Sequence, residues 1–501
     1  MTAPRDQAVI NGQETATTPV QTVQNYIGGK WVASSATHFA DVRNPATDAL
    51  LARVPLGDAA DVDRAVQAAL KAYPAWRATP PVNRVKPLFK LKSLLEANYD
   101  DIARVCTLEH GKTLDESRSS VRRAIDNVDL AIGTPDRMMG TSLEDIAAGI
   151  DCHTVRQPMG VFAAITPFNF PAMVPFWFLP HAVACGNTFI VKPSERVPLS
   201  QVKMFEMLHE AGFPEGVVNL VNGAKEAVDG ILDHAGIVGV SFVGSSPVAH
   251  YVYRRGAEKG KRVQALGGAK NFVVVMPDAD MTRAAQISTE SCFGCAGERC
   301  LANSVVLAVG DAYDAIQDKL IAEAKKLKVG DGLEPGVTMG PVITKQHREK
   351  VLGYIEKGLA EGARLVLDGR AFKDAKHPEG YYLGPSIFAE VKPEMTIGRE
   401  EIFGPVLCLM RAKDFDEAVE IVRKHELGNA TSIFTTSGKW AREYRYRVEP
   451  SMLGVNIGVA APMAFFPFGG AKHSFFGDLK AHGRDAVEFY TDKKVVITRW
   501  F

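Results

Sequence analysis

One cysteine stands in a sequence setting suited to nucleophilic chemistry. Cys300 follows Gly294-Cys-Ala-Gly-Glu-Arg299, a segment made mostly of small residues. Small neighbours leave a sulfur open to a substrate, and the adjacent Arg299 is expected to favour the thiolate, which is the attacking form. A buried structural cysteine is the alternative, and the segment alone does not exclude it. Cys300 is therefore a candidate nucleophile.

A second candidate group lies beyond a short apolar run. Thr188-Phe-Ile-Val191 reads as a strand and is followed by Lys192-Pro-Ser-Glu195. A carboxylate just beyond a parallel strand can accept hydrogen bonds from both hydroxyls of an adenosine ribose and would repel a 2′-phosphate. Since the chain contains no G-x-G-x-x-G, the usual dinucleotide fingerprint is missing, and a surface glutamate remains the alternative.

The other cysteines indicate neither disulfides nor a metal. The chain has seven cysteines, an odd and scattered number that argues for a reducing compartment. Cys292-x-x-Cys295 has the spacing of half a zinc site, but no second pair or nearby histidine completes a tetrahedral set. We expect no metal.

Composition limits the classes of function. The 501 residues are 46% hydrophobic and 23% charged, with a formal net charge of zero, so two or three domains are expected and neither nucleic acid nor an anionic membrane is an expected partner. Val161 to Gly186 is long and almost uncharged, but four prolines interrupt it, which predicts a buried wall rather than a membrane helix. The polar start of the chain resembles no targeting signal, so the cytoplasm is the expected location.

Alternating strand and helix patterns position these candidates. Asn25–Trp31 reads as a short strand with a Gly-Gly turn, and a helical pattern starts near Asp58. From Val161 the order is that of a parallel α/β sheet, whose ligands lie at the carboxyl ends of the strands. A second α/β run begins near Asn271 and continues past Phe434. Asp151–Arg156 and Lys494–Thr498 read as exposed strands, and covering the terminal one favours a homo-oligomer.

Seven motifs together show a resemblance that no single one carries. In order and spacing they resemble the aldehyde dehydrogenase superfamily over nearly the whole chain, from about Tyr26 to the end. They are Thr166-Pro-Phe-Asn-Phe-Pro171, Lys192-Pro-Ser-Glu195, Phe242-Val-Gly-Ser245, Leu266-Gly-Gly268, Gly297-x-x-Cys300, Glu400-Glu-Ile-Phe-Gly-Pro405 and Pro467-Phe-Gly-Gly470.

The resemblance implies an α/β fold in three parts. These are a Rossmann-type parallel-sheet domain for NAD, an α/β catalytic domain and a small β element for oligomerisation. Mapped onto this chain, residues 1–22 form a loosely ordered tail, 23–140 and 160–267 the NAD domain, 268–470 the catalytic domain, and 141–159 with 484–501 the β element. A dimer or a tetramer is expected.

The resemblance also assigns roles to single residues. Cys300 would be the nucleophile, and the Asn169 amide with the Cys300 backbone N–H would form the oxyanion hole, a kind of donor that contributes roughly 3–4 kcal/mol in known cases. Lys192 and Glu195 would hold the adenosine ribose. The remaining residues expected to bind NAD are Thr166, Phe168, Arg196, Ser245, Gly267, Glu401 and Phe403.

One departure from the family pattern concerns the second half of the reaction. Most members have a glutamate before Leu-Gly-Gly that serves as base for a hydrolytic water, and here the position is Ala265. Loss of a positioned base removes a factor of roughly 100 to 10,000 from a proton transfer. A thiol attacks a thioester more readily than water does. Coenzyme A is therefore the expected acceptor.

With this departure, the sequence pattern resembles that of the CoA-acylating methylmalonate-semialdehyde dehydrogenases. The matching stretches include Gly260-Lys-Arg-Val-Gln264 and Val275-Met-Pro-Asp-Ala279, although the usual Gly-Gln-Arg-Cys is Gly297-Glu-Arg-Cys300 here. In that branch two arginines clamp the substrate carboxylate, and by motif position they would be Arg123 and Arg299. Arg122 is an alternative to Arg123, and a solvated helix face is another.

The expected reaction is oxidation of a malonate or methylmalonate semialdehyde by NAD, loss of CO2 and transfer to CoA, giving acetyl-CoA or propanoyl-CoA. The first alternative is a hydrolytic NAD-dependent aldehyde dehydrogenase that makes a free acid from another aldehyde. An alternative of a different class is a non-catalytic structural relative. The intact Cys300, Asn169, Glu195 and Glu401 argue against the last one.

Overall fold

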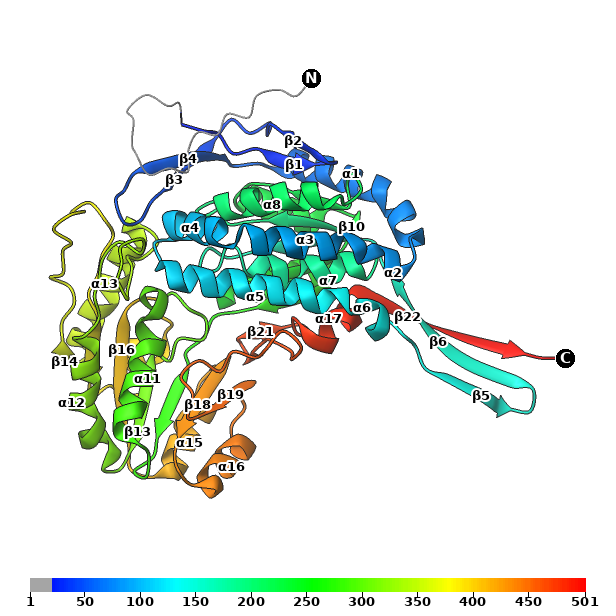
Figure 1. Ribbon diagram of the computed structural model, residues 1–501. Coiled ribbons are helices and arrows are strands. Elements are labelled where there is room, and N and C mark those ends of the chain that lie inside the picture. Colours follow the sequence, from blue (N-terminus) through cyan, green and yellow to red (C-terminus); the bar gives the residue numbers. More distant parts are fainter. Residues whose placement is uncertain (1–19) are drawn as a thin grey trace.

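The computed structural model describes residues 20–501, and Figure 1 shows two α/β bodies and a projecting β arm. The predicted tail, residues 1–22, therefore lies almost entirely outside the described residues. The fold is that of the predicted α/β class, and both large sheets are mixed: the first has antiparallel strands at both edges and the second at one edge.

The first sheet has eight strands in the order β2-β1-β9-β8-β7-β10-β11-β21. Its five central strands are parallel and follow the 3-2-1-4-5 order of a Rossmann fold, so the strand order reverses between β7 and β10. The strands are β1 (Asn25–Ile27), β2 (Lys30–Val32), β7 (Val161–Ile165), β8 (Thr188–Lys192), β9 (Val218–Leu220), β10 (Ile237–Val243), β11 (Arg262–Leu266) and β21 (Phe475–Phe476).

Helices cover both faces of this sheet because alternate side chains of its strands point to opposite sides. On β7, Val161 and Ala163 enter a core with α1 (Ala59–Ala78), α9 (Lys225–Asp233) and α10 (Ser246–Glu258). Phe162 and Ala164 enter the other core, against a helical layer. That layer contains α2 (Pro81–Arg84), α3 (Lys86–Ala97), α4 (Tyr99–His110), α5 (Leu114–Ile132), α6 (Thr134–Arg137), η1 (Val174–Trp177), α7 (Leu179–Ala184), α8 (Leu199–Ala211) and α17 (Gly483–Tyr490).

The second sheet repeats the same central strand order. It runs β14-β15-β16-β13-β12-β18-β19, with only β14 antiparallel. Its strands are β12 (Phe272–Val275), β13 (Val305–Val309), β14 (Arg364–Leu367), β15 (Ser386–Ala389), β16 (Val406–Ala412), β18 (Ala430–Phe434) and β19 (Met452–Val455). The helices of this body are α11 (Met281–Phe293), η2 (Gly294–Gly297), α12 (Ala312–Ala324), α13 (Lys345–Ala360), α14 (Thr396–Arg399), α15 (Phe415–Lys424) and α16 (Gly438–Arg447).

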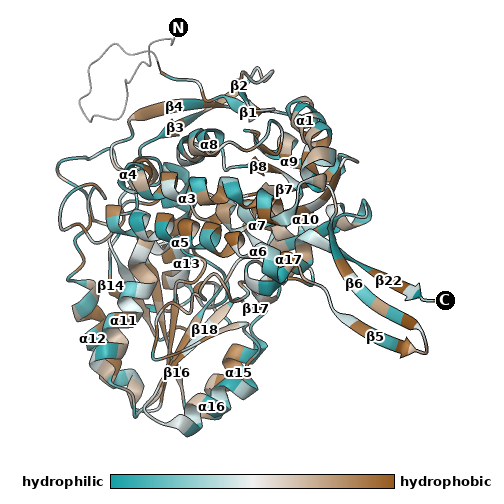
Figure 2. Cartoon of the chain, turned by 45° about the vertical axis from the view of Figure 1, so that its right-hand side comes forward, coloured by the Kyte–Doolittle hydropathy of each residue, from teal (hydrophilic) through white to brown (hydrophobic). Residues whose placement is uncertain are grey.

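Three smaller sheets complete the fold. The arm consists of β22 (Thr491–Arg499), β6 (Ile150–Pro158) and β5 (Ser142–Ala147), and it extends away from both bodies in Figure 1. Figure 2 shows apolar residues along this arm. The other two sheets pair β3 (Phe39–Arg43) with β4 (Leu50–Pro55), and β17 (Leu427–Gly428) with β20 (Ala471–Lys472).

The sequence-based elements agree with the structure at most positions. Asn25–Trp31 forms the predicted hairpin, with positive φ at Gly28 and Gly29, and the helix expected near Asp58 starts there because the Asp58 side chain accepts the Ala60 N–H. The proline-rich stretch after Val161 is buried, as predicted. Among residues 20–501, no helix is long and apolar enough to cross a membrane.

Candidate active site

Cys300 lies on a loop with an unusual backbone. After α11, Cys295, Ala296 and Gly297 all have left-handed conformations, with φ of 51°, 51° and 76°. Such a conformation costs a non-glycine residue roughly 1–2 kcal/mol, so other contacts must hold it. One such contact is the Glu116 carboxylate, which accepts the Cys295 N–H at 2.6 Å.

The Cys300 main chain is fixed by two asparagines from strand starts. Asn271, just before β12, donates its side-chain N–H to the Cys300 carbonyl at 2.9 Å. Asn429, just before β18, donates to the same oxygen at 2.8 Å. The nucleophile candidate therefore sits at the amino ends of β12 and β18, facing the first body, and its side chain is half-buried.

Arg299 acts on the Cys300 thiol in the predicted direction, but it does not by itself produce a thiolate. Burial, followed by the negative charge of Glu401, raises the pKa of the Cys300 thiol to about 12. Arg299 lowers that pKa but does not outweigh the other two effects. Its guanidinium lies 3.5 Å from Cys295 Sγ and 3.6 Å from Glu116, so much of its charge is directed elsewhere. The thiol is protonated in the structure as it stands.

Asn169 meets the Cys300 loop from the first body. It follows β7 at the sheet's switch point and is buried, and its Nδ2 donates to the Glu298 carbonyl at 3.1 Å. An amide nitrogen carries two N–H groups, so one remains for a ligand beside Cys300. The buried Lys112 donates to the Asn169 carbonyl and lies over the Phe170 ring at 3.8 Å, which holds this turn in place.

The predicted ribose pair lies at the end of β8. Lys192 Nζ is 3.5 Å from Glu195 Oε2; the lysine is buried and the glutamate side chain is 31% exposed. Thr166 donates its backbone N–H to the Lys192 carbonyl at 3.1 Å, which joins the ends of β7 and β8. Arg196 lies over the Phe168 ring at 5.5 Å. The predicted NAD-binding residues Thr166, Phe168, Lys192 and Arg196 thus lie with Glu195 around the carboxyl ends of β7 and β8.

The N-terminus of α10 provides the next group. Ser245 is the exposed N-cap residue, and its side chain makes no capping hydrogen bond. Backbone N–H groups at a helix start attract phosphate oxygens. The neighbouring Ser246 is engaged instead, since its Oγ accepts the Gly268 N–H at 2.9 Å and donates to the His473 carbonyl at 2.7 Å.

Glu401 approaches the same turn from the second body. Its Oε1 accepts the Ala269 N–H at 2.9 Å, and a Cβ on Gly268 would meet its Oε2 at 2.5 Å. Burial raises the pKa of Glu401 to about 7. Phe403 has a positive φ of 58° and lies 5.8 Å from the Phe168 ring, between centroids. The Glu401 carboxyl group therefore lies near Cys300, but its hydrogen bond to the Ala269 N–H and its close approach to Gly268 hold it at residues 268–269.

Ala265 offers no side chain to the site. It belongs to β11, pairs with Phe242 and Phe476 on the neighbouring strands, and is fully buried in the core beneath α10. A methyl group at this position can neither accept nor donate a proton.

Arg122, Arg123 and Arg299 differ in whether an acidic side chain already pairs with the guanidinium group. Arg122 makes two hydrogen bonds to Glu96, at 2.6 and 2.8 Å, and lies over Tyr99, so it is committed to the surface. Arg123 is half-buried and donates to the Pro462 carbonyl at 2.9 Å. Arg299 faces Glu116, while its Nε has no partner among the described residues. The structure thus favours Arg123 over Arg122 as an anion ligand.

Comparison with known proteins agrees with this site. The model of the aldehyde dehydrogenase family matches residues 31–496. The chain belongs to the aldehyde dehydrogenase family.

Several relatives are close over their whole length. A malonate-semialdehyde dehydrogenase of Geobacillus kaustophilus (strain HTA426) is 50% identical over 97% of this chain and 100% of its own. The methylmalonate-semialdehyde dehydrogenase structure from Oceanimonas doudoroffii has a TM-score of 0.94 at 46% identity, covering 96% of this chain and 99% of that one. A Sinorhizobium meliloti 1021 structure complexed with NAD has a TM-score of 0.95 at 41% identity, covering 97% and 99%.

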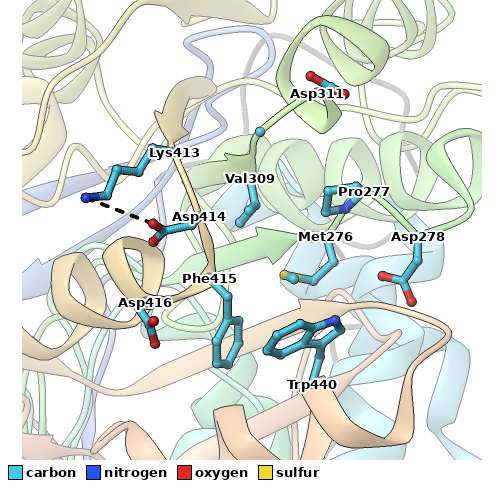
Figure 3. A pocket seen from close by; sticks show the side chains of 11 residues that line it. Met276, Pro277, Asp278, Val309, Asp311, Lys413, Asp414, Phe415, Asp416 and Trp440 are labelled. Atoms are coloured by element: carbon cyan, nitrogen blue, oxygen red, sulfur yellow. Dashed lines mark ion pairs between the residues drawn. The ribbon is translucent and has the colours of Figure 1, made fainter.

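A separate hollow of about 510 Å³ lies at the opposite end of this dehydrogenase's second sheet (Figure 3). It opens at the carboxyl ends of β12, β13 and β16, whereas Cys300 lies at the amino ends. Its carboxylates are largely satisfied: Asp278 accepts hydrogen bonds from Thr435 and Thr436, Asp414 caps α15, and Asp416 pairs with Arg447. The hollow therefore takes no part in the site around Cys300.

Sequence reasoning missed the residues that hold the dehydrogenase's reactive groups in place. In the sequence, Asn271 marks only the start of the second α/β run, and no motif assigns a site role to Asn429, Glu116, Lys112 or Glu298. Their contacts run mostly to backbone atoms far along the chain, 129 residues apart for Asn429 and Cys300. The only available signal was the departure from Gln to Glu at position 298.

Proposed function

We propose that this enzyme oxidises malonate or methylmalonate semialdehyde with NAD, releases CO2 and transfers the remaining acyl group to coenzyme A. The observation that carries the proposal is the combination of Cys300 and Asn169 at one site with a buried alanine at position 265. Relatives about 50% identical that carry the name malonate-semialdehyde dehydrogenase support the substrate class.

The residues around the switch point fit NAD. A half-exposed carboxylate at Glu195 suits ribose hydroxyls, and the uncapped start of α10 at Ser245 suits a pyrophosphate. Glu401 and Phe403 approach from the second body, where a nicotinamide ribose would lie. When bound, NAD supplies the hydride acceptor. Thr166, Phe168, Lys192, Arg196 and Gly267 complete the proposed binding set.

The first chemical steps belong to Cys300 and Asn169. Cys300 Sγ loses its proton and bonds to the aldehyde carbon, and the carbonyl oxygen becomes an oxyanion. The free N–H of Asn169 and the Cys300 backbone N–H donate to that oxygen and stabilise its charge. When the carbon gives up its hydride, the oxyanion collapses to a carbonyl, leaving a thioester on Cys300.

The same donors serve decarboxylation and release. The C–C bond to the β-carboxylate breaks, CO2 leaves, and the electron pair forms a thioester enolate that the Asn169 amide stabilises; a proton from water then restores the acyl group. The CoA thiolate attacks the thioester carbonyl and expels the Cys300 thiolate. Because Ala265 cannot remove a proton from water, hydrolysis does not compete efficiently.

Arg123 is proposed to bind the substrate carboxylate, with Arg299 as its partner. Arg123 has no ion-pair partner within the described residues, and its known donor contact is a neutral carbonyl. A charged hydrogen bond of roughly 1.5–3 kcal/mol would be lost in Arg123→Gln, so KM for a semialdehyde should rise by about tenfold or more while KM for propanal stays unchanged. Arg122→Gln is the matched control and should change neither value.

Product analysis tests the reaction. Methylmalonate semialdehyde labelled at its carboxylate carbon is incubated with NAD, with and without CoA, and products are identified by mass spectrometry. We expect unlabelled propanoyl-CoA and labelled CO2, with little sustained NADH formation when CoA is omitted. Label retained in the CoA product, or free acid formed at full rate without CoA, refutes the proposal. Cys300→Ser should abolish NADH formation, and Cys295→Ser is its control.

A hydrolytic reaction is the second candidate, and one observation favours it. Glu401 is a buried carboxyl group with a pKa of about 7, and its charge acts on the Cys300 thiol. A base with that pKa could in principle activate water. Its hydrogen bond to the Ala269 N–H instead fixes it at the proposed ribose site. Glu401→Gln would abolish free-acid formation if Glu401 were the base.

We further propose that the functional division of the chain follows its sheets. Residues 23–140 and 160–267 would bind NAD, 268–470 would carry catalysis, and the arm formed by 141–159 and 484–501 would join copies into a dimer or tetramer. The strand memberships support this division with two exceptions: β21 adds residues 475–476 to the edge of the first sheet, and residues 483–490 form α17, which packs on the helical layer of the first body.

A further inference from the structure

Three titratable side chains, those of Glu298, His110 and His347, cluster behind the proposed oxyanion site. The carboxyl group of Glu298 and the ring of His110 are both fully buried, and Glu298 Oε2 lies 3.9 Å from His110 Nε2. Neither atom has a hydrogen-bond partner within the described residues, nor has His110 Nδ1. Buried polar atoms without partners are rare in folded proteins, so this arrangement calls for an explanation.

The second oxygen of Glu298 points the other way. Oε1 accepts the Ile343 N–H at 3.1 Å and lies 3.4 Å from His347 Nε2. His347 Nε2 also contacts the Phe403 carbonyl at 2.6 Å, so that nitrogen carries a proton and donates it. Glu298 is thus already satisfied on the His347 side, and Oε2 is the oxygen left facing His110.

Burial favours the neutral forms of all three groups. Burial raises the pKa of Glu298 well above its ordinary value, lowers the pKa of His110 well below its own, and lowers that of His347 to about 4. The charged groups that act on the cluster are Lys112, Arg196 and Lys350, and none is within ion-pair distance of Glu298. A neutral carboxyl group has a proton to donate, and a neutral imidazole has a nitrogen to accept it.

Both members of this pair touch the loop that carries Asn169. The His110 ring stacks on Phe168, with centroids 6.1 Å apart and an interplanar angle of 25°. Phe168 immediately precedes Asn169, whose amide donates to the Glu298 backbone carbonyl at 3.1 Å. Glu298 in turn lies two residues before Cys300. The pair therefore spans the two loops whose relative position sets the oxyanion site.

We propose that Glu298 and His110 are a hydrogen-bonded pair of positioning residues, in which the Glu298 carboxyl donates to His110 Nε2 and holds the Asn169 amide in register with Cys300. This inference deepens the proposed function, since it rests on Asn169 acting as the oxyanion donor. The 3.9 Å separation exceeds hydrogen-bond distance, so the proposed bond requires the two side chains to move about 1 Å closer together. Neither residue touches the substrate; both act through Asn169.

The pair gives the enzyme a distinct pH dependence. Because the folded-state pKa of Glu298 is raised, the hydrogen bond is complete at low pH and is lost as pH rises through that value. An ionised Glu298 has lost the proton that it donates, so contact with Nε2 would require the other His110 tautomer and a buried charge without an ion-pair partner. The Cys300 thiol changes in the opposite sense, since it becomes more reactive as pH rises. The two effects can therefore be separated.

Single-turnover formation of NADH from propanal, measured against pH, tests the pair. Propanal lacks the carboxylate, so the outcome does not depend on the proposed semialdehyde or on CoA. Glu298→Gln keeps an uncharged donor toward His110 and should keep the rate within about threefold of wild type, while the decline of the wild-type rate with rising pH disappears. Glu298→Ala and His110→Phe should each lower the rate by about tenfold or more, with KM little changed.

Three further measurements separate positioning from structural damage. The double variant of Glu298→Ala and His110→Phe should be no slower than either single variant, as expected for residues that act as a unit. Alkylation of Cys300 by iodoacetamide should change little in any of them. Glu290→Gln, on the exposed face of α11, is the matched control. Three outcomes would overturn the proposal: a Glu298→Gln rate that still declines as pH rises, additive losses in the double variant, or activity that falls only in proportion to the titratable Cys300 thiol.

Discussion

Cys300 shows how far one residue's chemistry depends on a neighbour that is distant in the sequence. Its thiol pKa of about 12 reflects burial first and the charge of Glu401 second. Glu401 itself has a pKa of about 7, so it is neutral below that pH and charged above it. Its opposition to the thiolate therefore develops as pH rises through about 7.

Removing that charge should make Cys300 more reactive. We expect Glu401→Gln to speed alkylation by iodoacetamide at pH 8 by about three- to tenfold, since tenfold corresponds to one pKa unit of the thiol. At pH 6 the ratio to wild type should approach one. Glu400→Gln is the control, because Glu400 is partly exposed and bonds to Tyr354. Equal rates for wild type and Glu401→Gln at both pH values would contradict this account.

Ala265 allows the missing base to be restored. Ala265→Glu should produce CoA-independent NADH turnover at least tenfold above wild type, a conservative part of the roughly 100 to 10,000-fold effect of a positioned base. Ala265→Gln has the same volume without the proton acceptor and should show no such gain. Steady-state NADH formation without CoA measures the effect, and thiol titration confirms that each variant is folded. A gain of equal size in both variants would contradict the interpretation.

The sequence predicted reactive groups better than the groups that hold them. Cys300, Asn169 and Glu195 could be proposed from residue type and motif, and the structure brings the first two to one place. Asn271 and Asn429 could not, because an asparagine that bonds a distant backbone carbonyl has no local signal. Arg299 favours the thiolate as expected, but burial and the charge of Glu401 outweigh it, and sequence adjacency indicates neither of these two effects.

At the scale of elements, sequence periodicity predicted regular strands and helices. It did not predict the segments in which the backbone is irregular. The predicted strand Thr188–Val191 is β8 at Thr188–Lys192, and the predicted strand Asp151–Arg156 lies within β6 at Ile150–Pro158. The left-handed run at Cys295 and Ala296 was not predictable, because neither residue type favours positive φ. Tertiary contacts impose it.

One helix start depends on a buried acid. Pro198 precedes α8 and has no capping side chain, and Glu109 from α4 replaces it. Its carboxyl group accepts the Leu199 N–H at 2.6 Å, the Ser200 N–H at 3.0 Å and the Ser200 hydroxyl at 2.5 Å. Burial outweighs these bonds and raises the pKa of Glu109 to about 7.

Glu109→Gln should destabilise this junction. An amide has one oxygen, so its NH2 group would face a backbone donor, at a cost of roughly 1–3 kcal/mol in the free energy of unfolding. The raised pKa means that the stability contributed by Glu109 is full at acidic pH and declines as pH rises through about 7. Thermal unfolding should therefore show a lower midpoint for the variant, with the difference largest near pH 5.5. Glu206→Gln, exposed on α8, is the control. A larger difference at pH 8.5 would contradict the assigned sign.

At the scale of the whole molecule, two sheets with the same central strand order meet so that unlike ends face each other. The carboxyl ends of β7, β8 and β10 carry the proposed NAD residues, and the amino ends of β12 and β18 hold Cys300. This arrangement explains why every proposed step needs residues from both bodies. A sequence can indicate each sheet by its alternation of strand and helix, but their mutual orientation depends on packing between distant segments.

The arm leaves an apolar row without a cover in the single chain. Antiparallel register aligns Leu143, Cys152 and Ile497 across β5, β6 and β22, with Val495 two residues farther along. Leu143, Val495 and Ile497 are 65%, 59% and 66% exposed. Directly paired residues share a face of a sheet, so these side chains form one surface. An exposed apolar strand of this kind is usually covered by another chain.

Ile497→Asp should therefore weaken self-association. Burying an isoleucine contributes roughly 1.5–3 kcal/mol, and a two-fold interface contains the position twice, so loss of about 3–6 kcal/mol raises the dissociation constant by about a hundredfold or more. Sedimentation velocity across a concentration series should show smaller species for this variant than for wild type. Lys494→Asp, on the opposite face of β22, should leave the distribution unchanged. A monomeric wild type, or an Ile497→Asp variant that assembles like wild type, would show that this face is not the interface.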